Sequence, residues 1–158
     1  MQIRELERRD VEPLKRILQA TNVFSDEEVE VAVELMEATL EKTEDYIQRT
    51  IVDDENTVQG YYCVGATPMT RSTFDLYWIA VNPDFHGKGI GFQLLNDCEQ
   101  TVRSMSGNLI VVETSSLPKY ESTRKFYARN NYVETARLRD YYAPGDDLMI
   151  FTKHLQEH

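Results

Sequence analysis

The sequence contains little of what marks an exported, membrane-spanning or metal-dependent protein. Only two cysteines occur, Cys63 and Cys98, and neither has a Cys-x-x-Cys partner or a neighbouring histidine, which argues against a disulfide framework and a metal site. No apolar run approaches the roughly 20 residues of a membrane helix, and the N-terminal segment is charged where a signal peptide is apolar. We therefore expect a soluble, cytoplasmic protein with reduced thiols and no metal.

Basic residues are also scarce. The chain has 17 Lys and Arg against 27 Asp and Glu, a net charge of −10, which argues against a nucleic-acid partner because phosphate binding depends on clustered cations. The excess negative charge lies mainly in residues 26–55. A segment of this kind attracts cationic substrates in some proteins and is only a solvated helix face in most, and both interpretations stay open at this point.

The length of 158 residues and a composition that is 41% hydrophobic and 28% charged are those of one globular domain. The chain has no internal repeat, low-complexity tract or linker, so we expect a single domain over residues 1–158. Near the N-terminus, a short strand at 3–6 precedes a helix for which Asp10 is a suitable N-cap. A second helix begins at Ser25, which forms a Ser-x-x-Glu capping box with Glu28.

After residue 45 the sequence changes from helical spacing to an alternation of β-branched and aromatic residues. This alternation predicts three antiparallel strands at about 46–52, 58–66 and 73–81. A helix at about 89–105 follows and ends at Gly107, the residue type favoured at helix C-termini.

The last third of the chain begins with the continuous apolar run 109–112, which predicts a strand buried on both faces in a parallel pairing. A helix at 119–130 comes next. A final hairpin of strands 132–141 and 147–153, turned at 143–146, completes a mixed α/β chain.

The segment most informative about function is 81–91, Val-Asn-Pro-Asp-Phe-His-Gly-Lys-Gly-Ile-Gly, between a predicted strand and a predicted helix. Its glycines let the main chain approach a ligand closely, and the helix aims free N–H groups and a partial positive charge at that ligand. This arrangement is typical of an anion site, most naturally for a pyrophosphate. The spacing is neither GxGxxG nor GxxxxGK[ST]. A glycine-rich connection without a ligand is the alternative.

This segment resembles the Q/R-x-x-G-x-G/A loop of the GNAT superfamily of acyl-CoA-dependent N-acyltransferases. Residues 120–132, Tyr-Glu-Ser-Thr-Arg-Lys-Phe-Tyr-Ala-Arg-Asn-Asn-Tyr, are similar to the second family segment, TRxFYxxxGY. The resemblance covers residues 74–132 and is closest to ribosomal-protein alanine acetyltransferases. It implies an α/β (α+β) fold with a mixed, mostly antiparallel central sheet of six to seven strands, a central parallel pair and about four flanking helices.

The resemblance also implies acetyl-CoA as co-substrate. Loop amides would hold its pyrophosphate, and strand amides would hold the thioester carbonyl and the pantetheine arm. Two departures from the family pattern occur. His86 replaces Gln or Arg and offers fewer donors, and Asn131 replaces a glycine at a left-handed position. The implied cofactor-binding residues are Ile79, Ala80, Val81, His86, Gly87, Lys88, Gly89, Ile90 and Gly91.

Two side chains are candidates for the chemistry of transfer to an amine. Glu113 follows a buried strand at its carboxyl end, and a glutamate on the corresponding strand of the related enzymes is the general base. Its alternative role is a solvated carboxylate at a strand end. Tyr127 matches the family tyrosine proposed to protonate the departing sulfur, and its alternative role is a core aromatic.

Three further residues are candidates for binding the acceptor. Asp75 and Tyr77 alternate outward on the strand before the loop, although a solvated face would also explain them. Tyr141 belongs to a tyrosine pair in the C-terminal hairpin, which resembles the hairpin bordering the acceptor site of the alanine acetyltransferases; an ordinary hairpin with exposed tyrosines is the alternative. We expect a small cationic amine or a peptide N-terminus as acceptor and no nucleic acid or membrane.

Two other functional classes compete with the enzyme. A catalytically silent coenzyme-A-binding sensor or interaction module would keep the loop and lack turnover, and a nucleotide or phosphate binder would bind ATP as well as acetyl-CoA. The presence of both Glu113 and Tyr127 favours the enzyme. The sequence identifies neither the acceptor, nor the length of the acyl chain, nor whether the molecule is a homodimer.

Overall fold

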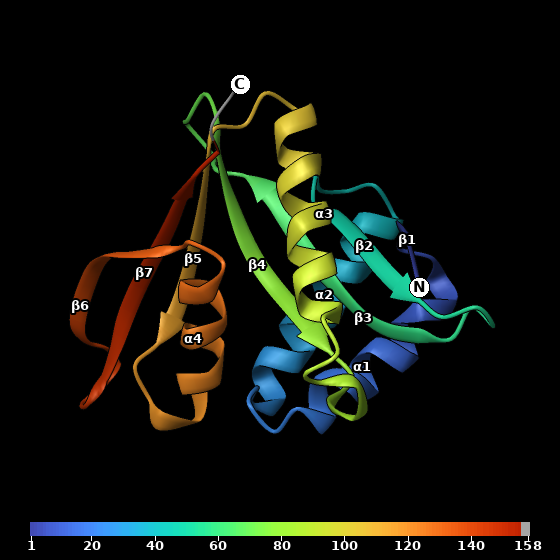
Figure 1. Cartoon of the computed structure of the whole chain (residues 1–158), viewed down its shortest axis with the longest axis horizontal. Coiled ribbons are helices and arrows are strands. Elements are labelled where there is room, and N and C mark those ends of the chain that lie inside the picture. The colour runs from blue at the N-terminus through green and yellow to red at the C-terminus, as the bar shows by residue number, and fades with distance from the viewer. Residues whose placement is uncertain (156–158) are drawn as a thin grey trace.

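Seven strands form one sheet in the order β1-β2-β3-β4-β5-β7-β6 in the computed structural model, which describes residues 1–155 (Figure 1). All neighbours are antiparallel except β4 and β5, which are parallel. This is the mixed, mostly antiparallel sheet that was expected. Its strands are β1 (Gln2–Glu5), β2 (Ile47–Val52), β3 (Val58–Ala66), β4 (Thr73–Val81), β5 (Leu109–Ser115), β6 (Val133–Ala143) and β7 (Asp146–His154).

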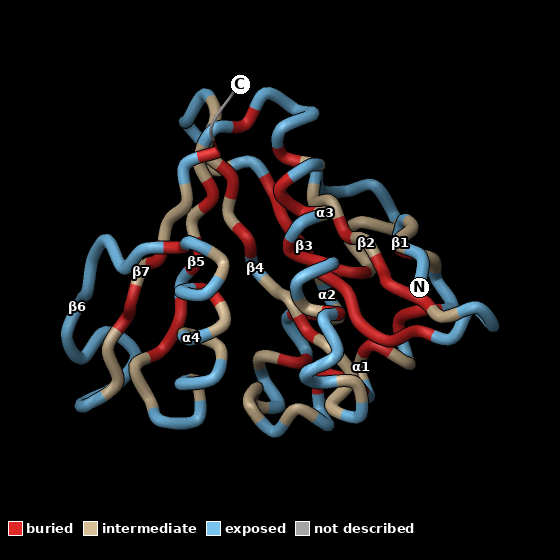
Figure 2. Tube along the Cα trace, viewed as in Figure 1, coloured by how far each residue is buried: buried red, intermediate tan, exposed pale blue. Residues whose placement is uncertain are grey.

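Four α-helices cover the sheet, two on each face. One core joins α1 (Val11–Ala20) and α2 (Asp26–Leu40) to one face, and a second core joins α3 (Ile90–Ser104) and α4 (Glu121–Arg129) to the other. Figure 2 shows the inner strand β3 buried along almost its whole length between these layers, while β6 at one edge is exposed throughout. No helix within residues 1–155 is long and apolar enough to cross a membrane.

The start of α2 confirms the predicted capping box. The Ser25 hydroxyl accepts a hydrogen bond from the Glu28 amide at 3.1 Å, and the Ser25 amide donates to the Glu28 carboxylate at 2.9 Å. Asp10 directly precedes α1 as expected, but its carboxylate does not cap that helix. It accepts two hydrogen bonds from the Arg4 guanidinium and one from the Glu7 amide, so it ties strand β1 to the helical layer.

Two predicted helix ends differ in outcome. Asn131 after α4 has φ of 70°, which confirms the predicted left-handed conformation. The prediction for Gly107 was wrong in its reason, because the left-handed residue after α3 is Ser106, with φ of 63°. Gly107 is needed for space instead, since a Cβ there would clash with a methyl group of Val102 and lie 2.8 Å from the Phe74 ring.

The expectation that 109–112 is buried on both faces was wrong. Ile110 and Val112 are buried against α3 and α4, whereas Leu109 and Val111 on the opposite face are only half-buried. The reason is that α1 and α2 pack on the part of the sheet formed by β2, β3 and β4, and the buried core of that face contains no residue of β5. This half of the sheet therefore has one partly uncovered face.

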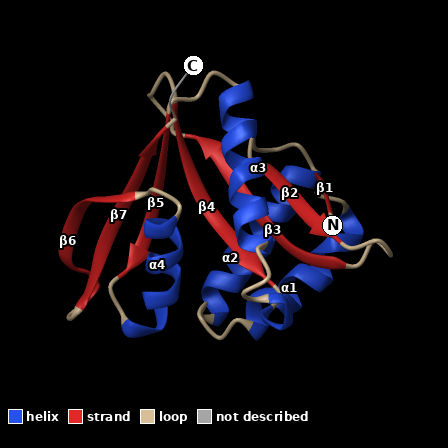
Figure 3. Cartoon of the chain, in the orientation of Figure 1, coloured by secondary structure: helices blue, strands red, loops and turns tan. Residues whose placement is uncertain are grey.

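Strands β4 and β5 pair only where both begin, over 73–75 and 109–111, and diverge toward their carboxyl ends (Figure 3). A bulge interrupts β4 beyond this point. Cys63 of β3 lies opposite Trp78, but the next residue, Val64, lies opposite Leu76, so Tyr77 has no partner in the register. The extra residue reverses the alternation of faces, and Ile79 consequently packs against the same core as Leu76. The divergence opens the sheet at its centre.

Candidate active site

The glycine loop joins β4 to α3 through the short turn Pro83–Phe85. Gly87 and Gly89 have φ of 78° and 79°, and a Cβ on either would meet no atom within 4 Å. Glycine is therefore required at these two positions by the left-handed backbone rather than by crowding. Gly91 has the opposite requirement, because a Cβ there would lie 3.1 Å from the Phe126 ring. It allows α3 to pack closely on α4.

The N-terminus of α3 has no side-chain cap. Its N-cap is Gly89, the first helical hydrogen bond runs from the Gln93 amide to the Gly89 carbonyl at 3.0 Å, and no acidic residue lies in the first turn. The amides of the first turn, residues 90–92, consequently have no helical acceptor and carry the positive end of the helix dipole. The sequence after the loop thus leaves donors available for an anionic ligand.

These amides border a cleft of about 640 Å³, which we call the loop cleft. Its other wall is α4, which contributes Phe126 and Arg129. Arg129 is a cation that the sequence argument missed, although it stands two residues after Tyr127 in the family segment. The predicted residues that line the loop cleft are Ile79, Val81, His86, Gly87, Gly89, Ile90 and Gly91.

Three of the predicted binding residues have side chains that are not positioned to bind a ligand in the loop cleft. Nε2 of His86 lies 3.0 Å from the Val81 carbonyl, which accepts its hydrogen, so this nitrogen is not available to a phosphate. The Lys88 ammonium lies 5.2 Å from the centre of the Phe85 ring and is not part of the cleft wall. The side chain of Ala80 is buried in the core on the opposite face of the sheet.

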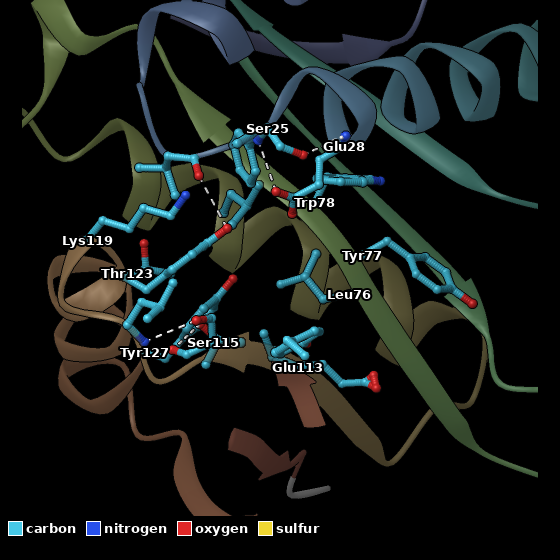
Figure 4. A pocket seen from close by; sticks show the side chains of 18 of the residues that line it. Ser25, Glu28, Leu76, Tyr77, Trp78, Glu113, Ser115, Lys119, Thr123 and Tyr127 are labelled. Carbon is cyan, nitrogen blue, oxygen red and sulfur yellow. Dashed lines mark hydrogen bonds between the residues drawn. The ribbon is translucent and has the colours of Figure 1, made fainter. Parts of the chain in front are cut away.

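A second cleft of about 390 Å³ lies between the diverging ends of β4 and β5, and we call it the sheet cleft (Figure 4). Ile79 and Thr123 line both clefts, so the two adjoin each other. The walls come from the α1–α2 loop, the start of α2, both strands, α4 and the C-terminal hairpin. Among the lining residues are Phe24, Ser25, Glu28, Tyr77, Trp78, Glu113, Ser115, Lys119, Tyr120, Tyr127, Tyr142 and Asp146.

Tyr127 projects from α4 into the core on the α3 side and reaches the sheet cleft with its ring. The residue is only 4% exposed. Burial, followed by the nearby Cys98, raises the pKa of its phenol well above the usual value, and no hydrogen bond contributes to that shift. The hydroxyl is therefore protonated at neutral pH and has a hydrogen to donate within the cleft.

Glu113 occupies the opposite face of β5 from Val112, which packs in the same core as Tyr127. Its side chain is exposed, and Figure 4 shows the carboxylate directed away from Tyr127. The two predicted catalytic side chains thus border one cleft from opposite faces of the sheet. A reacting group between the diverging strands would have the carboxylate on one side and the phenol on the other.

Carboxylates dominate the charge of the sheet cleft. Glu28, Glu113 and Asp146 line it, against the single cation Lys119 among the lining residues. Burial, followed by Glu28, Asp146 and Tyr142, raises the pKa of Tyr120 to about 12. Burial, followed by Glu113, likewise raises the pKa of Tyr142 to about 12. The cleft therefore presents a negative potential to whatever enters it.

The second family segment has a structural task at this site. The Arg124 guanidinium donates hydrogen bonds to the carbonyls of Ser115 and Leu117, at 2.8 and 3.0 Å, where the chain leaves β5. The Ser115 hydroxyl in turn donates to Asp146 at 2.5 Å. Arg124 thereby joins α4, the end of β5 and the C-terminal hairpin around the sheet cleft.

Of the three residues expected to contact an acceptor, only Tyr77 lines the sheet cleft. Tyr141 is not part of the wall of the sheet cleft. It packs edge-on against Tyr142, which does line the cleft. Tyr77 lines the cleft, but its ring stacks edge-on against Tyr46. Asp75 lies outside the wall, where its carboxylate accepts a hydrogen bond from the Thr67 hydroxyl at 2.7 Å.

The two cysteines offer no nucleophile to either cleft. Cys63 and Cys98 are free and buried, and they belong to the cores on opposite faces of the sheet. Burial raises the pKa of the Cys63 thiol to about 12, and burial together with Glu99 and Asp97 raises that of Cys98 well above its usual value. Both thiols are therefore protonated and enclosed.

The loop amides and the adjoining sheet cleft suit the transfer of an acyl group from a bound coenzyme to a second ligand. A family model for the acetyltransferase (GNAT) domain matches residues 45–134. The chain belongs to this family and is an N-acetyltransferase of the acyltransferase class. No protein of curated function matches the chain significantly.

Solved structures agree with this assignment. A crystal structure from Desulfovibrio desulfuricans, described as an acetyltransferase of the GNAT family, is 36% identical, with a TM-score of 0.91 over 97% of this chain and 98% of that one. Two more distant structures share the fold. An acetyltransferase from Salmonella typhimurium with acetyl-CoA has 20% identity and a TM-score of 0.77 over 100% and 95%. The ribosomal-protein-S18-alanine N-acetyltransferase from Escherichia coli has 16% identity and 0.76 over 99% and 95%.

Proposed function

We propose that this chain, as one domain over residues 1–158, transfers an acetyl group from acetyl-CoA to a primary amine by direct attack. The observation that carries the proposal is the meeting of the two clefts at Ile79 and Thr123. In the loop cleft, the amides of 87–91 and the Arg129 guanidinium suit a pyrophosphate. In the sheet cleft, the opened β4 edge suits an extended pantetheine arm.

The fit of the coenzyme rests on groups that lack partners within the protein. The first-turn amides of α3 have no helical acceptor, and the β4 main chain beyond Asp75 is not paired with β5. The coenzyme supplies an activated thioester. The chain supplies donors along the whole path from the loop to the opening, with Ile79 to Val81 as the amides nearest the thioester carbonyl in this arrangement.

The chemistry assigned to the side chains follows from their faces. Glu113 accepts a proton from the acceptor ammonium, because only a neutral amine attacks a carbonyl carbon. The carbon–nitrogen bond then forms as the carbon–sulfur bond breaks, and the proton that the new amide nitrogen loses balances the one that the thiolate gains to leave as free thiol. Tyr127 donates a hydrogen bond to the departing thiolate. Its raised pKa favours stabilisation of the sulfur by that hydrogen bond over early transfer of the proton.

The acceptor proposed here is a small cationic amine or a peptide N-terminus. The carboxylates of the sheet cleft support a cationic acceptor. The similarity of the C-terminal hairpin to that of alanine acetyltransferases supports a peptide. The 16% identity to the Escherichia coli enzyme shows a common fold alone, so the choice depends on the cleft itself.

Release of free thiol from acetyl-CoA, measured with a panel of monoamines, diamines, amino acids and short peptides, tests the proposal. We expect thiol release that depends on both acetyl-CoA and an amine, and on Glu113, with Glu113→Gln lowering kcat/KM about 100-fold at neutral pH. The matched control is Glu134→Gln on the exposed strand β6. Coenzyme binding without amine-dependent thiol release for any acceptor would contradict the proposal.

A further inference from the structure

Two of the three carboxylates that line the sheet cleft come from different parts of the fold. Glu113 is on β5, and Glu28 is in the first turn of α2, which packs on the other part of the same sheet face. Figure 4 shows them on opposite sides of the opening with Leu76 between them. No ion pair among residues 1–155 involves either side chain. Neither carboxylate is paired with a cation of the protein, and the hydrogen bonds that Glu28 accepts from the Ser25 amide and from Tyr120 do not neutralise its charge.

Glu28 is held in place independently of any ligand. The capping box fixes one of its oxygens on the Ser25 amide at 2.9 Å, and the Glu28 main chain is fixed by the Ser25 hydroxyl. The ring of Phe24 stacks edge-on against Trp78 beside it, at 5.3 Å between centroids. The carboxylate is thus preorganised at the wall of the cleft, so little conformational entropy is lost when it binds a cation.

A second feature indicates that the cleft is built for a ligand. Tyr127 is 4% exposed and lines the same cleft, yet no hydrogen bond contributes to the shift of its pKa. The Tyr127 hydroxyl is not among the fully buried polar atoms that lack a partner, so it faces the space of the cleft, where it can donate to a ligand. The carboxylates thus border a cleft that also has a phenol donor on its wall.

Resting on the proposed function, we propose that the acceptor carries two cationic nitrogens and that Glu28 binds the one that does not react. The substrate class is a diamine or polyamine, with one amine deprotonated at Glu113 and the distal ammonium held by Glu28 beside the Tyr120 ring. A peptide N-terminus carries only one cationic group near the reacting nitrogen. A monoamine leaves Glu28 without a partner.

A matched pair of acceptors tests this assignment. We expect kcat/KM for 1,4-diaminobutane to exceed that for n-butylamine by about 10-fold, the size of one charge-assisted hydrogen bond. The preference should shrink as salt is raised from about 0.05 to 0.5 M, since the attraction between the two charges is screened. Short peptides with free N-termini should be poorer acceptors than the diamine.

The variant Glu28→Gln removes the charge but keeps the capping box, because glutamine serves equally at that position. We expect the diamine-to-monoamine ratio to fall about 10-fold in this variant. Glu27→Gln, one residue earlier on the exposed face of α2, removes the same charge outside the cleft and should keep the ratio. Thermal melting of both variants verifies that α2 remains folded.

The outcomes separate this proposal from the proposed function. Amine-dependent thiol release with an equal preference for both amines, with a preference for peptides, or with an unchanged ratio in Glu28→Gln would overturn the diamine assignment alone. Absence of amine-dependent thiol release with every acceptor, under conditions where calorimetry detects acetyl-CoA binding, would overturn both.

Discussion

The two clefts differ in how they are encoded. The loop cleft is formed by one contiguous segment and the facing side of α4, and its main determinants are main-chain amides. The sheet cleft is formed by side chains from widely separated parts of the chain, within 23–28, 76–79, 112–127 and 142–146, and its determinants are charges and rings. A site made of main-chain amides depends on the backbone angles of the loop, so substitutions of its glycines should impair binding. A site made of side chains can change its ligand through single substitutions.

The largest effect that this comparison predicts concerns the residue between the clefts. Tyr127→Phe should lower kcat about 100-fold, because the departing thiolate loses its hydrogen-bond donor. Coenzyme affinity measured by calorimetry should stay within about twofold, since the loop cleft is intact. An unchanged kcat would refute the role of Tyr127, and a parallel loss of affinity would show that the clefts are not separable.

A change remote from both clefts should affect stability alone. Asp10→Asn removes the partner of the Arg4 guanidinium, and it should lower the free energy of unfolding by about 2 kcal/mol while KM for both substrates is unchanged. Burial raises the pKa of Asp10, but the hydrogen bonds and charge of Arg4 and the Glu7 amide outweigh it, and the net pKa lies below the usual 3.8.

The sign of this shift fixes its pH dependence. The carboxylate of Asp10 stabilises the fold fully above about pH 4, and that contribution is lost as the pH falls through the lowered folded-state pKa. The gap in stability between the wild type and Asp10→Asn should therefore be constant at neutral pH and shrink in acid. Denaturant unfolding at pH 7 and pH 3 measures it; a gap that widens in acid would contradict the ion pair.

The loop cleft should respond to backbone strain. Gly89→Val places a β-branched residue at φ of 79°, and we expect coenzyme affinity to fall about 10-fold, because 1–3 kcal/mol of strain displaces the first-turn amides. Gly145→Val in the β6–β7 turn, at φ of 82°, is the matched control with similar strain outside the loop cleft. Equal coenzyme affinity in the two variants would contradict the role of the loop.

The smallest effect should come from His86, which stands where the family pattern has Gln or Arg. His86→Gln should change coenzyme affinity less than about threefold, because the imidazole is already engaged with the Val81 carbonyl. Calorimetric titration of coenzyme A at pH 7 measures it. A gain of 10-fold or more would mean that His86 limits phosphate binding in the wild type.

Much of the fold could be predicted from local signals. The capping box at Ser25, the glycines at 87 and 89 and the left-handed Asn131 each express a requirement of the local backbone, and all three recur in the structure. The burial of 109–112 could not be predicted in this way. It depends on where α1 and α2 end over the sheet, which is a property of the tertiary packing.

The sheet cleft was less accessible to sequence reasoning for the same reason. The bulge at Tyr77 leaves no trace in the alternation of β4, yet it decides which face each later residue occupies. The irregular pairing between Leu138 and Ala143 similarly obscures which tyrosine of the hairpin lines the cleft, and Tyr142 does so in place of Tyr141. The sequence indicated only that Glu28 takes part in a capping box. That Glu28 also lines the sheet cleft depends on how α2 packs on the sheet.

The enclosed thiols have a kinetic consequence. Cys63 and Cys98 are buried and line neither cleft, so neither thiol can store the acetyl group between the two substrates. The proposed direct attack needs both reactants in the adjoining clefts at once, so it predicts initial-rate plots, for one reactant at fixed levels of the other, that intersect rather than run parallel.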